Sequence, residues 1–237
     1  MSNAYRTKNS TGLINKNKKI NFSFNGHTYH GYEGDTLASA LISNGIHLIG
    51  RSFKYHRPRG FLGVGVEEPN AMVQLHEGNK SEPNIIATEV ELVEGLKAKS
   101  QNCWPSVQFD IGEVNNLLNR FFPAGFYYKT FMWPKSFWMK IYEPFIRKAA
   151  GMGVAPLQPD PDRYEHNYEH CDVLVVGSGP SGLASALAAA KNGARVILAE
   201  DKANFGGSLL TDEVTIGNMS GKEWANDTVA QLKSLPN

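Results

Sequence analysis

The chain has 237 residues, of which 24 are Lys or Arg and 23 are Asp or Glu, so its formal net charge is +1. This length suggests one or two domains. The near-zero charge argues against a dedicated nucleic-acid binder, which is usually strongly basic. Hydrophobic residues make up 41% of the chain and charged residues 20%, which excludes a disordered, highly charged tail.

The sequence gives no sign of export or membrane insertion. No apolar stretch reaches the ~18 residues of a membrane-spanning helix, and the polar N-terminus lacks the apolar core of a secretion signal. Two cysteines, Cys103 and Cys171, are too few for a disulfide framework or a four-cysteine cluster. These features predict a reducing, cytoplasmic location.

The charge is uneven along the chain. Residues 1–60 hold nine Lys and Arg against two Asp and Glu, whereas residues 61–100 hold three against seven. Five basic side chains lie on loop 51–60, and Glu67-Glu68 follows shortly after. We expect a salt-bridged or partner-facing loop there rather than a nucleic-acid site. Residues 1–19, rich in Asn, Lys, Ser and Thr, predict a flexible arm.

Residues 20–97 predict a small α+β domain. Apolar and polar residues alternate over 20–32 around Asn25-Gly26, which is the strongest short-range signal for a β-hairpin. Further strand-like runs lie at 71–78 and 84–95.

A short helix is predicted between the hairpin and these strands. Asp35 or Thr36 can cap a helix over 37–42, and Asn44-Gly45 ends it. A hairpin, a helix and then more strands resemble the order of a β-grasp fold.

Residues 98–170 form an aromatic-rich connector. Eleven aromatic residues lie within 121–145, and interspersed prolines interrupt any long helix. Two short helices are predicted, at 134–142 and at 144–150 with Gly151 closing the second. So many aromatic side chains require burial, either between two domains or partly against another subunit. The Pro- and Asp-rich end of the connector predicts a linker.

The strongest chemical signal begins at residue 171. A Val-rich run over 171–176 is typical of a buried parallel strand, and a Gly-x-Gly-x-x-Gly turn follows at 177–182. An Ala/Leu-rich helix then ends at Asn192-Gly193, and a second strand ends at Glu200. This is the dinucleotide-binding fingerprint in its full β-α-β context.

Each part of the fingerprint has a physical role. Gly177 permits the tight turn, Gly179 lets the backbone approach a pyrophosphate, and Gly182 lets the helix pack on the strand. The N–H groups and the dipole of the first helical turn attract the phosphates. Glu200 can accept hydrogen bonds from a ribose diol and disfavours a 2′-phosphate, so NAD or FAD is expected before NADP.

The nucleotide domain is expected to be incomplete. Only 67 residues are present from Cys171 onward, whereas a domain of this type has roughly 100–150. They hold one β-α-β unit and a tail over 221–237 that predicts one more helix. We therefore expect residues 171–237 to be the start of a truncated Rossmann-like domain that exposes an apolar sheet edge and binds NAD poorly by itself.

Other reactive residues give weaker signals. His166, His170 and Cys171 lack a fourth ligand at suitable spacing, so no metal site is predicted. Cys103 has no assignable base and is expected to be a packed thiol. Neither a Ser/His/Asp arrangement nor a carboxylate pair was found, so no residue of this chain is predicted to be catalytic.

Several stretches resemble the N-terminal part of the alpha subunits of heterotetrameric sarcosine oxidases, and they span roughly residues 20–210. They are GDTLASALISNGIHLIGRSFKYHRPRG, EEPNAMVQL, SQNCWPSVQFDIGEVNNLL, PAGFYYKTFMWPKSFWMKIYEPFIRKAAG, PDPDRYEHNYEHCDVLVVGSGPSGLASALA and NFGGSLL. In related flavoproteins, a loop like the last one lies near the adenosine end of the cofactor. The candidate cofactor-binding residues are therefore Gly177, Gly179, Pro180, Ser181, Gly182, Glu200, Asp201, Gly206 and Gly207.

The resemblance implies an oxidoreductase subunit. Such enzymes oxidatively demethylate sarcosine to glycine, produce hydrogen peroxide, and pass the one-carbon unit to tetrahydrofolate or release it as formaldehyde. The alpha subunit is expected to hold NAD, or alternatively FAD, in its Rossmann-like module. FAD and FMN serve the whole complex of alpha, beta, gamma and delta subunits. The alternatives are a related flavin-dependent amine, proline or glycine dehydrogenase subunit, or a truncated, non-catalytic interaction module.

The resemblance also implies that residues 20–97 form a ferredoxin-like module. Ferredoxins hold a [2Fe–2S] cluster with four cysteine thiolates. The loop where these cysteines would be expected, at 50–69, contains none. We therefore expect a ferredoxin-like β-grasp domain without an Fe–S cluster, acting as a structural or interface module.

Overall fold

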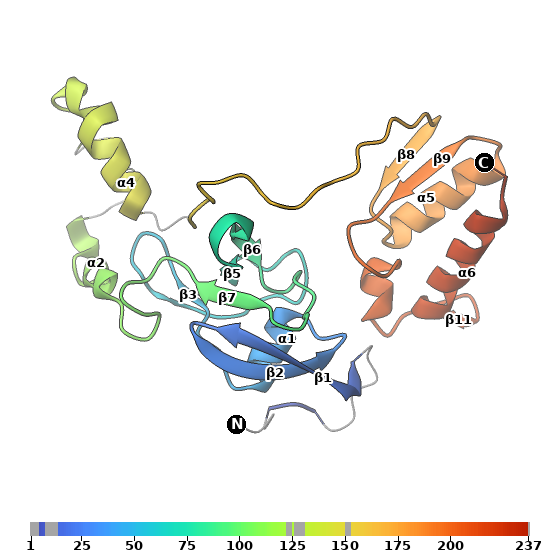
Figure 1. Cartoon of the computed structure of the whole chain (residues 1–237), viewed down its shortest axis with the longest axis horizontal. Coiled ribbons are helices and arrows are strands. Elements are labelled where there is room, and N and C mark those ends of the chain that lie inside the picture. The colour runs from blue at the N-terminus through green and yellow to red at the C-terminus, as the bar shows by residue number, and fades with distance from the viewer. Residues whose placement is uncertain (1–4, 8–13, 122–124, 126–130, 150–152, 237) are drawn as a thin grey trace. The chain divides into compact units, whose positions relative to one another are not determined.

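The computed structural model of the chain describes residues 5–7, 14–121, 125, 131–149 and 153–236 (Figure 1). These residues form two compact units, one that runs to Asp162 and one that begins at Arg163. Both units mix helices and strands. In the part of the chain that the structure describes, no helix is long and apolar enough to cross a bilayer.

A five-stranded mixed sheet forms the frame of the first unit, in the order β2-β1-β7-β5-β6. Strand β1 pairs antiparallel with β2 and parallel with β7, while β5 is antiparallel to both β7 and β6. The first and last strands therefore meet in the sheet, as in the β-grasp order predicted above. The strands are β1 (Asn15–Phe24), β2 (His27–Glu33), β5 (Met72–Leu75), β6 (Glu82–Ile86) and β7 (Lys97–Ser100).

The predicted hairpin is confirmed. Asn25 and Gly26 join β1 to β2 with φ of 51° and 81°, and two successive positive φ values are the mark of a type I′ turn. The strand starts earlier than predicted, at Asn15. Asn15 and Lys19 pair with Glu33 and Tyr32, and the register shifts between these two pairs. Part of the segment predicted as a flexible arm therefore belongs to the strand, because backbone pairing continues beyond the apolar positions that the sequence pattern detects.

The predicted helix is also confirmed, as α1 (Leu37–Ser43). Thr36 caps it in a reciprocal capping box with Ser39, and Gly45 follows its end with φ of 78°. The helix packs on the sheet in one hydrophobic core. The largest fully buried apolar side chains of this core are Phe22, Leu37, Leu41, Ile49, Leu92 and Val73.

The strand predicted at 84–95 is only partly correct. Strand β6 ends at Ile86, and the chain then turns so that Leu37 N–H donates to Val90 O and Leu92 N–H donates to Asp35 O. The apolar alternation at 90–96 thus reflects burial beneath α1 rather than a ladder. The last strand of this sheet, β7, begins at Lys97 and extends past the predicted domain boundary at 97.

The connector is built from short helical segments in its described parts. The helices predicted at 134–142 and 144–150 form a nearly continuous helical stretch. It begins as a 3₁₀ turn, continues as a π-helix and ends as an α-helix. The segments are η2 (Ile111–Glu113), α2 (Val114–Leu117), η3 (Asn119–Phe121), η4 (Lys135–Phe137), the π-helix η5 (Trp138–Tyr142) and α4 (Glu143–Ala149). Two small pieces lie before it: the paired strands β3 (Gly50–Arg51) and β4 (Pro58–Arg59), and the turn η1 (Gly78–Lys80).

Within the first unit, several described aromatic residues of the connector are exposed, and their burial between domains or against another subunit stays a prediction. Trp133 is 83% exposed and Phe145 71% exposed, while Phe131 and Tyr142 are half-buried against each other. The predicted Gly151 helix stop, the side chain of Phe121, and the four aromatics Phe122, Phe126, Tyr127 and Tyr128 lie outside the described residues.

In the second unit, the predicted β-α-β elements are present. The parallel strands β8 (Val173–Val176) and β9 (Val196–Ala199) are joined by α5 (Pro180–Lys191). Then come η6 (Gly207–Leu210), the hairpin of β10 (Thr215–Ile216) with β11 (Met219–Ser220), and α6 (Gly221–Ser234). Helix α6 is the tail helix predicted above, and it packs on α5 around the buried Leu183, Leu209 and Ala225 (Figure 1).

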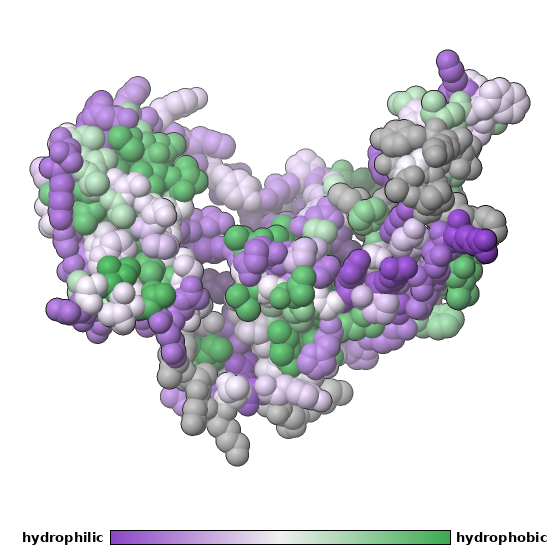
Figure 2. Space-filling model, turned by 180° about the vertical axis from the view of Figure 1, so that it is seen from behind, coloured by the Kyte–Doolittle hydropathy of each residue, from purple (hydrophilic) through white to green (hydrophobic). Residues whose placement is uncertain are grey.

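The sheet of the second unit is covered on one face only. Leu174 is 58% and Val176 80% exposed, whereas Val173 and Val175 on the opposite face are half-buried. Figure 2 shows apolar patches within the otherwise polar surface of this unit. Apolar strand residues normally pack against further structure. This face of the β8–β9 sheet therefore exposes apolar side chains to water that a covering element would bury.

Candidate dinucleotide-binding site

The glycine turn between β8 and α5 has the backbone geometry that the sequence predicts. Gly177 ends the strand with φ of 94°, a conformation that L-residues rarely adopt. Its N–H donates to Ala199 O at 2.8 Å, which joins the turn to the end of β9. A glycine is therefore required at this position for its conformation.

Gly182 is required for space. A Cβ atom added there would lie 2.0 Å from the carbonyl oxygen of Gly177. The absence of a side chain lets the first turn of α5 sit directly on the end of β8. This is the close helix–strand packing predicted for the third glycine of the fingerprint.

The N-terminus of α5 forms an open cradle. Gly179 is the N-cap residue and supplies no side-chain cap, so the first-turn N–H groups have no intrahelical acceptor. A Cβ atom added to Gly179 would meet no atom within 4 Å. The space that a side chain would fill is thus available to a phosphate, which the N–H groups and helix dipole favour. Pro180 and Ser181 lie exposed in this first turn.

Glu200 faces the turn, but both of its carboxylate oxygens already accept hydrogen bonds. Oε2 accepts from the N–H of Ser178 at 2.7 Å and from the Ser178 hydroxyl. Oε1 accepts the N–H groups of Asp201 and Lys202 at 3.0 and 3.1 Å. The carboxylate therefore also organises the protein's own loop, in addition to any role toward a ribose.

These contacts keep Glu200 ionised. Burial acts to raise the pKa of this carboxyl group, but the hydrogen bonds from Ser178 and Lys202 outweigh it and lower the pKa to about 2. A charged acceptor at the end of the second strand is what the fingerprint requires for a ribose diol.

Ser178 connects the turn to the second glycine loop, a role that the sequence reasoning missed. The residue is fully buried, and Gly206 N–H donates to its carbonyl oxygen at 3.0 Å and to its hydroxyl oxygen at 3.2 Å. A Cβ atom on Gly207 would come within 3.0 Å of Gly179 Cα. In the sequence, the feature that could have indicated this role is that Ser178 is a small polar residue between Gly177 and Gly179.

The structure thus brings most of the predicted site residues together. The three fingerprint glycines, Glu200, Gly206 and Gly207 lie around one turn. Asp201 contributes its N–H to this arrangement, whereas its exposed carboxylate points toward Lys202 at 3.6 Å. Most of the predicted cofactor-binding residues therefore border the N-terminus of α5.

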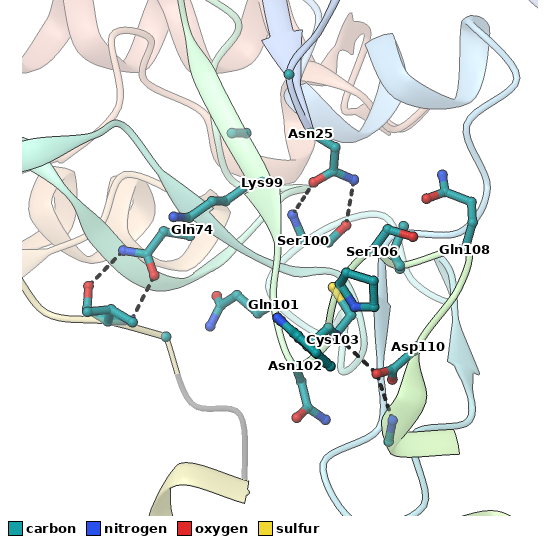
Figure 3. Close-up of a pocket in the computed structure, with 18 of the residues that line it drawn as sticks. Asn25, Gln74, Lys99, Ser100, Gln101, Asn102, Cys103, Ser106, Gln108 and Asp110 are labelled. Carbon is teal, nitrogen blue, oxygen red and sulfur yellow. Dashed lines mark hydrogen bonds between the residues drawn. The ribbon is translucent and has the colours of Figure 1, made fainter. Parts of the chain in front are cut away.

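A cavity of about 1240 Å³ lies elsewhere, in the first unit, where β1, β5 and β7 meet loop 101–112 (Figure 3). Its polar side chains bond one another. Asn25 and Ser100 form two hydrogen bonds of 2.9 and 2.8 Å, and Gln74 bonds both backbone groups of Val154 at 2.9 Å. Among the described residues, the buried side-chain atoms without a hydrogen-bond partner are Arg6 Nε and Asn44 Oδ1, and neither residue lines this cavity.

The same cavity wall contains Cys103. Burial raises the pKa of its thiol, and the negative charge of the nearby Asp110 raises it further. Asp110 in turn lies 2.6 Å from His56 Nδ1. The thiol is therefore protonated at neutral pH, which disfavours a role as nucleophile or metal ligand.

The basic loop forms ion pairs, but not with the acidic residues expected from the sequence. Arg51 is buried and pairs with Glu113 at 3.2 Å, and its guanidinium also donates to the backbone of Val107 and Gln108. Glu67 and Glu68 instead accept backbone N–H groups. Within the described ranges, no three His, Cys, Asp or Glu side chains are grouped as a metal site would require.

Two protein families match this chain. A family described as a 2Fe-2S iron-sulfur cluster binding domain matches residues 17–103, and a family described as an FAD dependent oxidoreductase matches residues 172–232. Cys103 is the single cysteine within the first range. The residues present there do not fit a cluster held by four thiolates.

Individual proteins match over most of this chain. Sarcosine oxidase subunit alpha of Rhizobium meliloti (strain 1021) is 56% identical over 95% of this chain, which spans 23% of that protein. The subunit alpha of Corynebacterium sp. (strain U-96) is 32% identical over 92% of this chain and 18% of its own length. A crystal structure of L-proline dehydrogenase from P. horikoshii superposes with a TM-score of 0.48 at 18% identity, covering 94% of this chain and 33% of that one. The resemblance seen in the sequence is confirmed, and the chain spans about a quarter or less of these curated relatives.

Proposed function

From its similarity to sarcosine oxidase alpha subunits over nearly its whole length, we propose that this chain is the N-terminal part of such a subunit. The observation that carries the proposal is 56% identity over 95% of the chain. The glycine turn described above adds the chemistry, because it offers a preformed cradle for an adenine dinucleotide within a region that matches FAD-dependent oxidoreductases.

The cofactor proposed for the cradle is FAD. The sequence alone placed NAD first, and both cofactors share the phosphates and the ribose that the fingerprint recognises. The match of residues 172–232 to an FAD dependent oxidoreductase family supports FAD. NAD is kept as the second candidate, since Glu200 suits the ribose diol of either.

The chain's own contribution is binding and orientation. The first turn of α5 holds the pyrophosphate through its N–H groups, and Gly179 leaves room for the phosphate oxygens. Glu200 would accept a hydrogen bond from the adenosine ribose in exchange for one of its four present donors from Ser178, Asp201 and Lys202. The loop at Gly206-Gly207 would line the adenosine end. An FAD held by these residues would supply the hydride-accepting chemistry of the enzyme.

The activity of the whole enzyme is proposed from the relatives. It is the oxidative demethylation of sarcosine to glycine, with hydrogen peroxide and either a tetrahydrofolate-bound one-carbon unit or formaldehyde as products. Beta, gamma and delta subunits are the proposed partners. The residues that oxidise the amine are proposed to lie outside this chain, since its sequence predicts no catalytic arrangement.

The experiment that tests the cradle uses the full-length subunit in its complex. Gly179→Val places an isopropyl group in the open space before the helix, and we expect the content of released dinucleotide to fall at least tenfold. Ala184→Val is the control, because it adds similar apolar bulk at an exposed position of the same helix. Chromatography of the released nucleotide separates FAD from NAD. An unchanged nucleotide content in Gly179→Val would contradict the proposed site.

A further inference from the structure

A buried carboxylate, Glu68, lies at the end of the loop 50–69 in which cluster cysteines would be expected. Glu68 is 2% exposed. Its Oε2 atom accepts the N–H groups of Leu62 and Gly63 at 2.5 and 2.6 Å. Its Oε1 atom accepts those of Asn70 and Ala71 at 2.6 and 3.1 Å. Four backbone donors from both sides of the loop thus converge on one side chain.

This environment stabilises a negative charge without a cation. In the part of the chain that the structure describes, no Lys, Arg or His side chain forms an ion pair with Glu68. Burial acts to raise the pKa of the Glu68 carboxyl group, but the hydrogen bonds from Gly63, Leu62, Asn70 and Ala71 outweigh it and lower the pKa. A carboxylate has about four lone-pair positions, and here four N–H groups occupy them.

The neighbouring Glu67 also accepts backbone hydrogen bonds from this loop, but at the surface. It is exposed, and its Oε1 atom accepts the N–H groups of Val64 and Gly65 at 2.8 and 3.1 Å. A Cβ atom on Gly63 would lie 2.8 Å from that oxygen. The loop therefore folds around carboxylate groups, with Glu68 as the internal one.

We propose that the Glu68 carboxylate replaces an iron–sulfur cluster as the internal anion on which this ferredoxin-like loop folds. Residues 17–103 match a 2Fe-2S cluster binding family but lack the thiolates to hold a cluster. A thiolate-ligated cluster carries negative charge and accepts N–H hydrogen bonds on its sulfurs. The buried carboxylate supplies both properties with no metal. The module is then redox-inert, and its loop geometry depends on one side chain.

The test compares Glu68→Gln with Glu67→Gln in the 237-residue chain, by amide hydrogen exchange. The amide side chain has one acceptor oxygen and directs its own N–H donors at the loop, so at most two of the four donors keep a partner. We expect exchange at Leu62, Gly63, Asn70 and Ala71 to accelerate tenfold or more. The exposed Glu67→Gln control removes the same charge one residue away and should leave these four amides protected. Unchanged protection in Glu68→Gln would overturn the proposal.

Two measurements on the unmutated chain keep the proposal testable if Glu68→Gln does not fold. The carboxyl carbon of Glu68 is followed by NMR during an acid titration, and it should stay ionised below the usual range for Glu. Protonation near neutral pH would overturn the proposal. Anaerobic incubation with iron and sulfide should produce no [2Fe–2S] absorption, whereas a bound cluster would contradict it. Neither readout depends on dinucleotide binding, so the outcome is independent of the proposed function.

Discussion

At Gly182 the packing of α5 on β8 leaves no room for a side chain. Propensity alone would favour alanine within a helix by ~1 kcal/mol. The added Cβ would instead lie 2.0 Å from Gly177 O and 3.1 Å from its carbonyl carbon, and both are backbone atoms that cannot rotate away. Glycine is therefore required at position 182 by the contact between α5 and the end of β8, and not by a backbone conformation that other residues avoid.

We expect Gly182→Ala to destabilise the second unit by about 1–3 kcal/mol, because the helix must move off the strand to relieve the clash. Denaturant unfolding followed by circular dichroism measures this. Gly179→Ala serves as the control, since its Cβ meets no atom within 4 Å. Equal unfolding midpoints for the two variants would show that the close packing does not determine stability.

Ser178 and Glu200 show a different residue-scale effect. A fingerprint acid is usually assigned to the ribose alone. Here the Glu200 carboxylate also binds the turn and its own loop through Ser178, Asp201 and Lys202. The side chain proposed to face the ribose is thus held in place, in its charged form, by the backbone of the turn and of its own loop.

At the scale of elements, the first unit is joined to a segment that the sequence assigns to a flexible arm. Arg6 donates to both carboxylate oxygens of Asp35 at 3.1 and 2.6 Å and to Ser43 Oγ at 3.0 Å. The Arg6 side chain is 10% exposed and that of Asp35 is fully buried. Asp35 also accepts the N–H of Tyr32, so this ion pair connects the N-terminal segment, the end of β2 and the start of α1.

Removal of Arg6 leaves the buried Asp35 charge without its cation. We expect Arg6→Ala to lower the free energy of unfolding of the first unit by about 3–5 kcal/mol. Lys18→Ala is the comparison, because the Lys18–Glu33 pair is exposed and such pairs contribute ~1 kcal/mol or less. Thermal unfolding of both variants distinguishes them. A loss for Arg6→Ala no larger than that for Lys18→Ala would mean that the arm adds nothing to the fold.

At the scale of the whole molecule, the two units differ in completeness. The first has a core with residues from the hairpin, α1 and the later strands. The second has three fully buried apolar residues in its core cluster, and the open face of its two-stranded sheet exposes Leu174 and Val176. A dinucleotide cradle on such a sheet has walls on one side of the turn only.

We therefore expect the 237-residue chain to bind FAD or NAD much more weakly than the full-length subunit does. A binding site gains affinity from surrounding walls that exclude water, and the described part of the second unit supplies few of them. Isothermal titration calorimetry of the 237-residue chain with each cofactor tests this. A submicromolar dissociation constant would show that the glycine turn and Glu200 suffice.

Sequence patterns predicted those structural features whose residues lie within a few positions of one another. Asn25-Gly26 dictated the hairpin, Thr36 with Ser39 capped α1, and the fingerprint glycines marked the β-α-β turn, because each depends on residues within a few positions of one another. The alternation at 90–96 misled, since the same apolar spacing serves a strand and a buried turn equally. Trp133 and Phe145 of the connector are exposed within this chain, and a partner or a neighbouring domain that would bury them cannot be identified from local residue patterns.

By itself, the sequence predicted most of the elements and the resemblance to sarcosine oxidase alpha subunits, and it made a dinucleotide the proposed ligand of the glycine turn. Tertiary structure alone decided that Ser178 joins Glu200 to Gly206 and that Arg6 reaches Asp35. The physical reason is distance along the chain: Arg6 and Asp35 are 29 positions apart and Ser178 and Gly206 are 28. Such pairs meet only when the core brings their elements together, and no local pattern of residue types records the meeting.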